Sequence, residues 1–157
     1  MKGIACGGNW IVDQVKIIDS WPPKCELANI LEEDSGTGGG AANVLTDLMR
    51  LGFPHPTYAI GCIGKDGFGE QILEHCRRNE IGTEFLTVLP DARTSYTDVM
   101  TIRDTGERTF FHCRGANARF APVHVPVEHL KQAGIRMFYL GYLLLLDREI
   151  VSRFEGR

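Results

Sequence analysis

Residues 35–52 read SGTGGGAANVLTDLMRLG, and this stretch decides the fold more than any other part of the chain. Four glycines and two alanines lead into a segment whose apolar side chains recur every three to four residues, at Ala41, Leu45, Leu48 and Leu51. That spacing predicts an amphipathic helix. Glycine has no Cβ, so its backbone can approach a ligand closely. Asn43, in the first turn, adds an amide that both donates and accepts hydrogen bonds. The stretch therefore predicts a glycine loop and a helix that bind a polar ligand.

The bulk properties predict one soluble domain in the cytoplasm. The chain has 157 residues, about one domain, and a formal net charge of −3 without clustered basic residues. These values give no reason to expect nucleic acid or a membrane surface as a partner. Five cysteines without a CxxC pair, and no apolar signal segment in Met1–Ile18, favour reduced thiols. The apolar run Met137–Leu146 is too short to span a bilayer.

The order of the elements predicts an α/β fold. Short apolar strands are expected at Ile4–Cys6, Trp10–Ile18 and Thr57–Ile63, an exposed strand at Glu26–Asp34, and a second helix at Glu70–Glu80 with Gly82 as its C-cap. Strand, glycine loop and helix in succession are typical of layered α/β domains with parallel strands.

The second part of the chain adds a hairpin to this pattern. Thr94–Ile102 and Arg108–Cys113 are rich in Thr, Tyr, Val and Phe, with turn residues between them, and predict two antiparallel strands. Pro126–Ala133 predicts a short helix, and Ile135–Leu140 predicts a further buried strand.

The glycine run has more than one interpretation. Gly36–Ala41 matches the dinucleotide pattern GxGxxG/A, but the preceding residues, Leu31–Asp34, are too acidic for a central strand. No acidic residue lies about twenty positions further on, around His55–Cys62. No GK[ST] follows, which excludes a P-loop. A tight turn without a ligand, or a loop that binds another polar ligand, remains.

Further motifs favour one family for this loop. Asp13 follows Gly8 by five residues, Gly38–Asn43 gives GGxxAN, and Gly64–Gly69 gives GxDxxG before the second helix. Gly106-Glu107-Arg108 lies in the hairpin turn, and Gly115-Ala116-Asn117 follows the hairpin. In this order and spacing, from Ile4 to about Asp147, the motifs resemble the ribokinase-like (PfkB) family of sugar and nucleoside kinases.

The resemblance implies an activity and a fold. Members of the family phosphorylate a hydroxyl of a sugar or nucleoside with Mg-ATP. Their fold is an α/β/α layered sheet with a small β-strand lid, which residues of about 10–35 and 94–115 would form here. By the same resemblance, Asp13 would accept hydrogen bonds from the acceptor, the backbone at Gly38 and Gly39 would approach it, and Asn43 would bind another hydroxyl.

Structural roles compete with some of these assignments. Asp13 is also compatible with a solvent-facing position on an edge strand, and Asn43 could serve as a helix cap. We expect Asp66 to cap the second helix and Asn117 to stabilise a turn. Glu107 and Arg108 are expected to be solvated, and the five histidines show no metal-ligand spacing.

Departures from the family pattern limit which substrate can be expected. In the ribose-specific branch, a Lys and a Glu stand at the positions of Gly40 and Gly141, and an Asn stands at the position of Ile11. Ribose is therefore not favoured. Another sugar or a nucleoside is expected.

The late DTxGAGD-like motif, which carries the catalytic base and the anion hole of the family, does not occur in this sequence. Residues 1–157 are therefore expected to be an acceptor-binding N-terminal portion without a catalytic residue or ATP site. We expect it to be inactive alone and to form a homodimer through the lid or self-associate through exposed sheet. The alternatives are a non-catalytic sugar-binding remnant or partner subunit and, third, a dinucleotide-dependent oxidoreductase.

Overall fold

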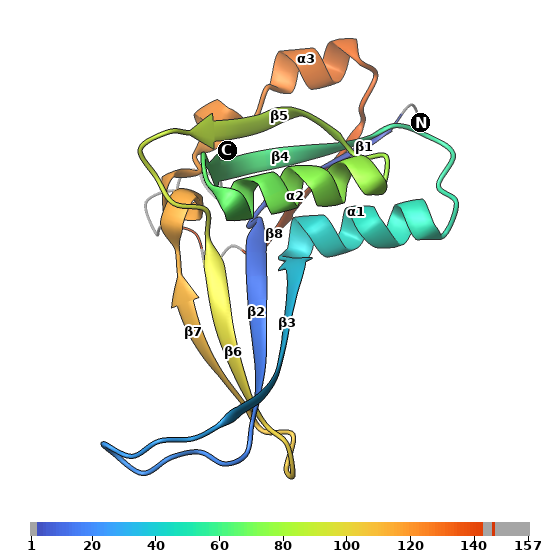
Figure 1. The fold of residues 1–157 in the computed structure, drawn as a ribbon. Helices are drawn as coiled ribbons and strands as arrows, with labels where there is room; N and C mark the ends of the chain where they lie inside the picture. The colour runs from blue at the N-terminus through green and yellow to red at the C-terminus, as the bar shows by residue number, and fades with distance from the viewer. Residues whose placement is uncertain (1–2, 143–145, 147–157) are drawn as a thin grey trace.

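The computed structural model describes residues 3–142 and 146, which form two four-stranded sheets (Figure 1). The first sheet has the order β5-β4-β1-β8 and the second has the order β3-β2-β6-β7. The strands are β1 (Ile4–Gly8), β2 (Ile11–Ile18), β3 (Ile30–Gly38), β4 (Thr57–Gly64), β5 (Gly82–Leu89), β6 (Tyr96–Ile102), β7 (Arg108–Cys113) and β8 (Met137–Gly141). The α-helices are α1 (Gly40–Arg50), α2 (Gly67–Arg78) and α3 (Val127–Gln132). Two 3₁₀ turns cover Gly115–Arg119 and Pro122–His124.

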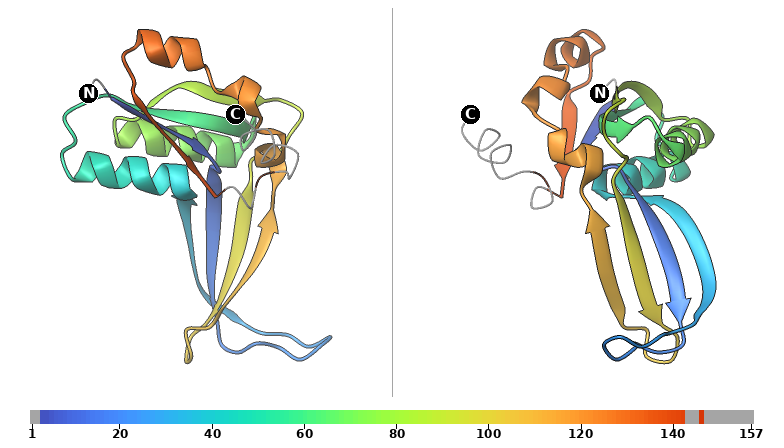
Figure 2. Two further views of the ribbon diagram at one scale, coloured as in Figure 1. Left: turned by 180° about the vertical axis from the view of Figure 1, so that it is seen from behind. Right: turned by 60° about the vertical axis from the view of Figure 1, so that its left-hand side comes forward.

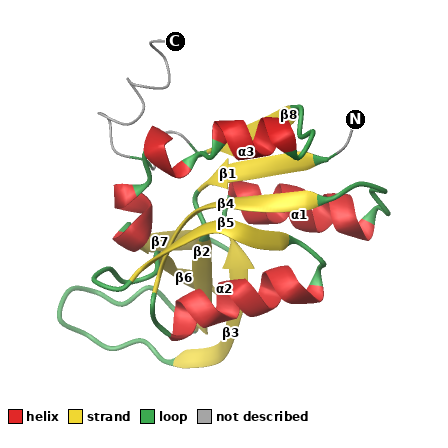
Figure 3. Cartoon of the chain, turned by 90° about the horizontal axis from the view of Figure 1, so that it is seen from above, coloured by secondary structure: helices red, strands yellow, loops and turns green. Residues whose placement is uncertain are grey.

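The first sheet is parallel and has helices on both faces, as Figure 3 shows from above. Its central strand β1 is fully buried, and successive side chains point to opposite faces. Ile4 and Cys6 pack in the cluster that contains the apolar residues of α1 and α2. Ala5 packs in the other cluster, with Leu130 of α3. The chain is therefore a three-layered α/β/α fold, which confirms the predicted fold class.

The second sheet extends away from the first, with its connecting loops at the far end (Figure 2). In it, β2 pairs in parallel with β6, while β2–β3 and β6–β7 are antiparallel pairs. The predicted hairpin of β6 and β7 is confirmed. Because β2 lies between β3 and β6, it is an interior strand.

Trp10 joins the two sheets at the point where β1 passes into β2. Its ring is fully buried, and its Nε1–H donates to the carbonyl of Ile60 at 3.0 Å. Its backbone is bound by the buried side chain of Asn117: Nδ2 donates to the Trp10 carbonyl at 3.0 Å, and the Trp10 N–H donates to Oδ1 at 3.3 Å. Asn117 was expected to stabilise a turn; its side chain instead binds the Trp10 backbone and anchors the second sheet to the first.

The end of the second helix differs from the prediction. Helix α2 ends at Arg78 with Asn79 as its C-cap, and the reversal uses Glu80 at φ 55°. Gly82 was expected to be the cap, but it begins strand β5, an element that the sequence pattern did not predict. Helix α2 begins at Gly67, three residues before the predicted Glu70, but the predicted cap is confirmed, because the Asp66 side chain accepts a hydrogen bond from the Gly69 N–H at 2.9 Å.

Three other predictions need correction. The glycine run is not a free loop as far as Gly38, because β3 includes Ser35–Gly38 and pairs with β2. Leu51 was assigned to the inner helix face, but it follows the last turn of α1 and is 84% exposed. Strand β8 was expected to be buried, yet Met137, Phe138 and Tyr139 are 48%, 37% and 38% exposed at the sheet edge.

The continuation of the apolar run through residues 143–145, and residues 147–157, lie outside the described residues. Within the described part of the chain, no helix is long and apolar enough to span a membrane.

Candidate functional site

Asp13 lies on an interior strand, opposite Gly36 of β3 and Thr97 of β6. Its carboxylate reaches over Gly38, since a Cβ added to Gly38 would overlap the Asp13 Oδ2 atom. The edge-strand interpretation of Asp13 is therefore wrong. Burial raises the pKa of the Asp13 carboxyl, while a hydrogen bond from Thr97 and the nearby His112 oppose that rise. A half-buried carboxylate thus lies beside the glycine run.

The glycine run passes directly from β3 into α1. Gly39 is the N-cap at φ 96°, and a Cβ there would meet the backbone oxygen of Asn9. No side chain caps the first turn of α1, so the helix-cap interpretation of Asn43 is wrong. The Asn43 backbone N–H donates to the Gly39 carbonyl at 3.0 Å. Its side chain is exposed and bonds to none of the described residues.

The end of β8 approaches the same glycines, which sequence reasoning did not foresee. A Cβ on Gly40 would lie 2.7 Å from the ring of Tyr142 and 3.2 Å from the hydroxyl of Tyr139. Tyr142 has a positive φ of 54°, a conformation that bulky residues rarely adopt and that clusters at functional sites. Two tyrosines therefore border the glycine run, next to Gly141.

A row of polar side chains crosses the second sheet from Asp13. Asp13 is in register with Thr97, and Thr97 is in register with His112 of β7. Residues in register share a face of the sheet, so all three lie on one face. The Thr97 hydroxyl also lies 2.9 Å from Nδ1 of His112. Thr97 and His112 had no motif signal in the sequence; only the strand register brings them to Asp13.

Beyond Asp13, the same face of the sheet carries an apolar hollow of about 250 Å³. It is bordered by Asp13 and Arg108 and by the side chains of Val15, Ile17, Val99, Thr101 and Phe110. Arg108 was expected to be a solvated turn residue; it is exposed, but it lines this hollow. The Asp13 face therefore combines one carboxylate with an apolar floor.

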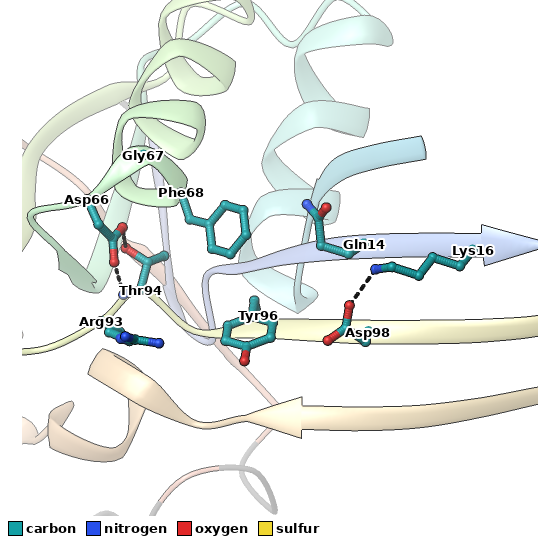
Figure 4. A pocket seen from close by; sticks show the side chains of 9 residues that line it. All are labelled: Gln14, Lys16, Asp66, Gly67, Phe68, Arg93, Thr94, Tyr96 and Asp98. Atoms are coloured by element: carbon teal, nitrogen blue, oxygen red, sulfur yellow. Dashed lines mark hydrogen bonds and ion pairs between the residues drawn. The ribbon is translucent and has the colours of Figure 1, made fainter. Parts of the chain in front are cut away.

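The opposite face of the second sheet carries a separate hollow of about 610 Å³, next to the start of α2 (Figure 4). Most of its charges already have partners. Lys16 contacts Asp98 at 2.6 Å, and Asp66 accepts hydrogen bonds from the backbone and hydroxyl of Thr94. Neighbouring residues of a strand point to opposite faces, so this hollow does not include Asp13.

The described residues contain no group of three His, Cys, Asp or Glu side chains that could hold a metal ion. All five cysteines are free thiols. Burial raises the pKa of Cys6 and of Cys76 to about 12 each, so these thiols are protonated and packed within the core.

Comparison with known proteins identifies the family. The profile of the pfkB family carbohydrate kinases matches residues 2–148. The chain belongs to this family. A protein of Arabidopsis thaliana named probable fructokinase-7 is 26% identical over 144 residues, which is 92% of this chain and 40% of that protein.

Solved structures confirm the ribokinase-like fold. Ribokinase from Giardia lamblia superposes with a TM-score of 0.81 at 21% identity, over 99% of this chain and 45% of that one. Fructokinase from Xylella fastidiosa with bound ATP gives a TM-score of 0.73 at 23% identity, over 99% of this chain and 47% of that one. The pfkB-family chain therefore spans less than half the length of these relatives.

Proposed function

We propose that the described residues bind the acceptor in the ATP-dependent phosphorylation of a sugar or nucleoside hydroxyl. One observation carries the proposal: the Asp13 carboxylate lies over Gly38, directly before the uncapped first turn of α1. A carboxylate accepts hydrogen bonds from hydroxyl groups, and ionised acceptors form the stronger bonds. Membership of a carbohydrate kinase family supports the same assignment.

The proposed acceptor site consists of Asp13, the backbone at Gly38 and Gly39, and the side chain of Asn43. The Asn43 amide has no partner among the described residues and would both donate to and accept from a hydroxyl. Tyrosine rings border Gly40 and Gly141, the positions where the ribose-specific branch has a Lys and a Glu. The surface next to the glycine run is therefore aromatic here, and not charged. This supports an acceptor other than ribose.

The described residues fit an acceptor molecule better than they fit Mg-ATP. Among the described residues, a second glycine-rich helix start lies at α2, where the Gly69 N–H is capped by Asp66, a carboxylate that would repel a phosphate. We assign no described residue to the nucleotide, which would supply the phosphoryl group. We propose that other residues provide the base and the anion-stabilising donors, and that this chain alone is catalytically inactive.

Calorimetric titration tests the acceptor site. D-fructose, D-ribose and adenosine are titrated into the chain and into Asp13→Asn, which preserves the shape but removes the charge. We expect one of them to bind, and Asp13→Asn to weaken it about 10–150-fold, the equivalent of about 1.5–3 kcal/mol for a charged hydrogen bond. Asp104→Asn, in the exposed hairpin turn, is the control and should bind as the unaltered chain does. No binding by the unaltered chain, or equal binding by Asp13→Asn, contradicts the proposal.

A non-catalytic subunit is the second candidate, because exposed apolar side chains offer a surface for another chain. The rings of Phe111 and Trp21 stack with their centroids 6.2 Å apart, and both side chains are about half exposed. We propose self-association through this sheet or through β8, in the cytoplasm. Sedimentation measures the association, and ATP-dependent product formation by the chain alone would exclude a purely non-catalytic role.

A further inference from the structure

A positive charge without a partner borders the face of the second sheet that carries Asp13. Arg108 is exposed and lines the same apolar hollow of about 250 Å³ as Asp13. Arg103, near the other end of the same hairpin turn, contacts Glu32 at 2.9 Å. The Arg108 guanidinium has no such partner among the described residues. Its N–H donors are therefore available to a ligand in the hollow.

The strand register places Asp13 and Arg108 at opposite corners of this hollow. Asp13 lies on β2, four residues before Ile17. Ile17 is in register with Thr101 of β6, and Thr101 is in register with Arg108 of β7. The rise along a strand and the spacing between strands then put the backbones of Asp13 and Arg108 about 16 Å apart. Since both residues line the hollow, a ligand in it lies between a carboxylate and a guanidinium.

The floor between these two charges is mostly apolar. Val15 is in register with Val99, and Val99 is in register with Phe110, so all three lie on this face. Such side chains pack against the C–H groups of a ligand but offer no hydrogen bonds. Thr101 adds one hydroxyl, beside Arg108. The polar contacts of a ligand are therefore concentrated at the two ends of the hollow.

The charges across this face would orient a ligand that carries a negative group. Strands β3 and β7 form the two edges of the second sheet (Figure 1). Asp34 of β3 is in register with Val15 and shares the face, whereas Arg108 lies on the β7 edge. A negative group is repelled by Asp34 and Asp13 and attracted by Arg108. The β7 end of the hollow is therefore its favoured position.

We propose that Arg108 binds an anionic group of the acceptor molecule, a phosphate or a carboxylate at the end that lies away from the glycine run. This deepens the proposed function and rests on it. A guanidinium matches carboxylate and phosphate oxygens with two parallel N–H donors. The hydroxyl-bearing end of the acceptor lies at Asp13 and Asn43. The substrate class is therefore a sugar or nucleoside that already carries a negative charge.

Calorimetric titration with matched neutral and anionic compounds tests this contact. D-fructose, D-ribose and adenosine are each compared with their terminal phosphate monoesters. D-fructose is also compared with 2-keto-D-gluconate, which has a carboxylate in place of one hydroxymethyl group. Because water screens an exposed ion pair, we expect one anionic compound to bind about five- to tenfold more tightly than its neutral counterpart. The compound that gains affinity identifies the group as a phosphate or a carboxylate.

Three variants test whether this preference depends on Arg108. Arg108→Gln removes the charge, and we expect it to abolish the preference while binding of the neutral compound stays within about twofold. Arg108→Lys keeps the charge without the planar pair of donors and should retain part of the preference. Arg103→Gln is the matched control, because it also removes an exposed arginine of this sheet but one that does not line the hollow. It should keep the full preference.

A preference for the anionic compound that survives Arg108→Gln would overturn the inference. So would neutral compounds that bind as tightly as all their anionic counterparts. In both cases, a neutral compound whose binding is weakened by Asp13→Asn leaves the proposed function standing. If neither the neutral nor the anionic compounds bind the unaltered chain, the proposed function fails and this contact fails with it.

Discussion

Replacement of Gly38 by alanine separates the binding role of Asp13 from the stability of the fold. An added Cβ at Gly38 would overlap Oδ2 of Asp13 and lie 3.2 Å from its Cγ, and its three nearest neighbours are all atoms of the Asp13 side chain. The backbone of Gly38 does not have positive φ, so alanine is compatible with its conformation. We therefore expect the main effect of Gly38→Ala to pass through the Asp13 carboxylate.

The magnitude follows from what Asp13 loses when it moves. Rotation away from its present position costs about 0.5–1.5 kcal/mol if the new χ angle is strained. The lost hydrogen bond from Thr97 adds about 1 kcal/mol. We expect Gly38→Ala to lower the free energy of unfolding by about 1.5–2.5 kcal/mol, and to weaken acceptor binding about 10–150-fold, as Asp13→Asn does.

A double-mutant cycle is the assay. The free energy of unfolding in urea and the dissociation constant of the bound sugar are measured for Gly38→Ala, Asp13→Ala and the double variant. Once Asp13 is truncated, Gly38→Ala should have almost no further effect on either quantity, so the two changes should be strongly non-additive. Gly36→Ala is the matched control, because its Cβ would meet nothing within 4 Å. Additive effects of Gly38→Ala and Asp13→Ala would refute the reasoning.

Three further variants test the frame around the site. In Gly39→Ala, the alanine would have to adopt positive φ and its Cβ would clash with the backbone of Asn9. We therefore expect urea denaturation to show a free energy of unfolding lower by about 2–6 kcal/mol. Asn117→Ala leaves the buried backbone groups of Trp10 unpaired and should cost about 2–4 kcal/mol by the same assay; a loss below about 1 kcal/mol would contradict the anchoring role. Burial alone would raise the pKa of Asp66, but hydrogen bonds, chiefly from Thr94, together outweigh it and lower the pKa. The ionised carboxylate therefore stabilises the fold above the pKa of the unfolded state, and this stabilisation is lost as the pH falls through the pKa of the folded state. The stability difference between Asp66→Asn and the unaltered chain should therefore shrink on acidification below about pH 4, and a constant difference in melting temperature would contradict this.

The fold could be predicted largely because periodicity and glycine positions are local signals. Helix α2 begins where Asp66 can cap it, and the β6–β7 hairpin has turn residues at its end. Strand β5 was missed because most of its residues are only partly buried and its sequence has no long continuous apolar run. The end of α2 was misplaced because Glu80, not glycine, adopts the positive φ.

The site was predictable only in part. Asp13, Gly38 and Asn43 have motif spacing, and the structure places Asp13 and Gly38 in direct proximity. Thr97 and His112 belong to the same face only through the pairing of β2 with β6 and of β6 with β7. Register between strands far apart in sequence is set by tertiary packing, and a one-residue slip would turn each side chain to the other face. No local pattern contains that information.

The same dependence on register changes the physical reason for the glycines. In a free loop, Gly38 would be needed for flexibility or for contact with a ligand. In strand β3, it is paired with Ile11 and lies diagonally across from Asp13, where any side chain would occupy the position of the carboxylate. Gly39 is needed for a different reason, the turn into α1 at positive φ. The two glycines therefore have separable functions: the first makes room for the acidic side chain, and the second directs the helix away from the strand.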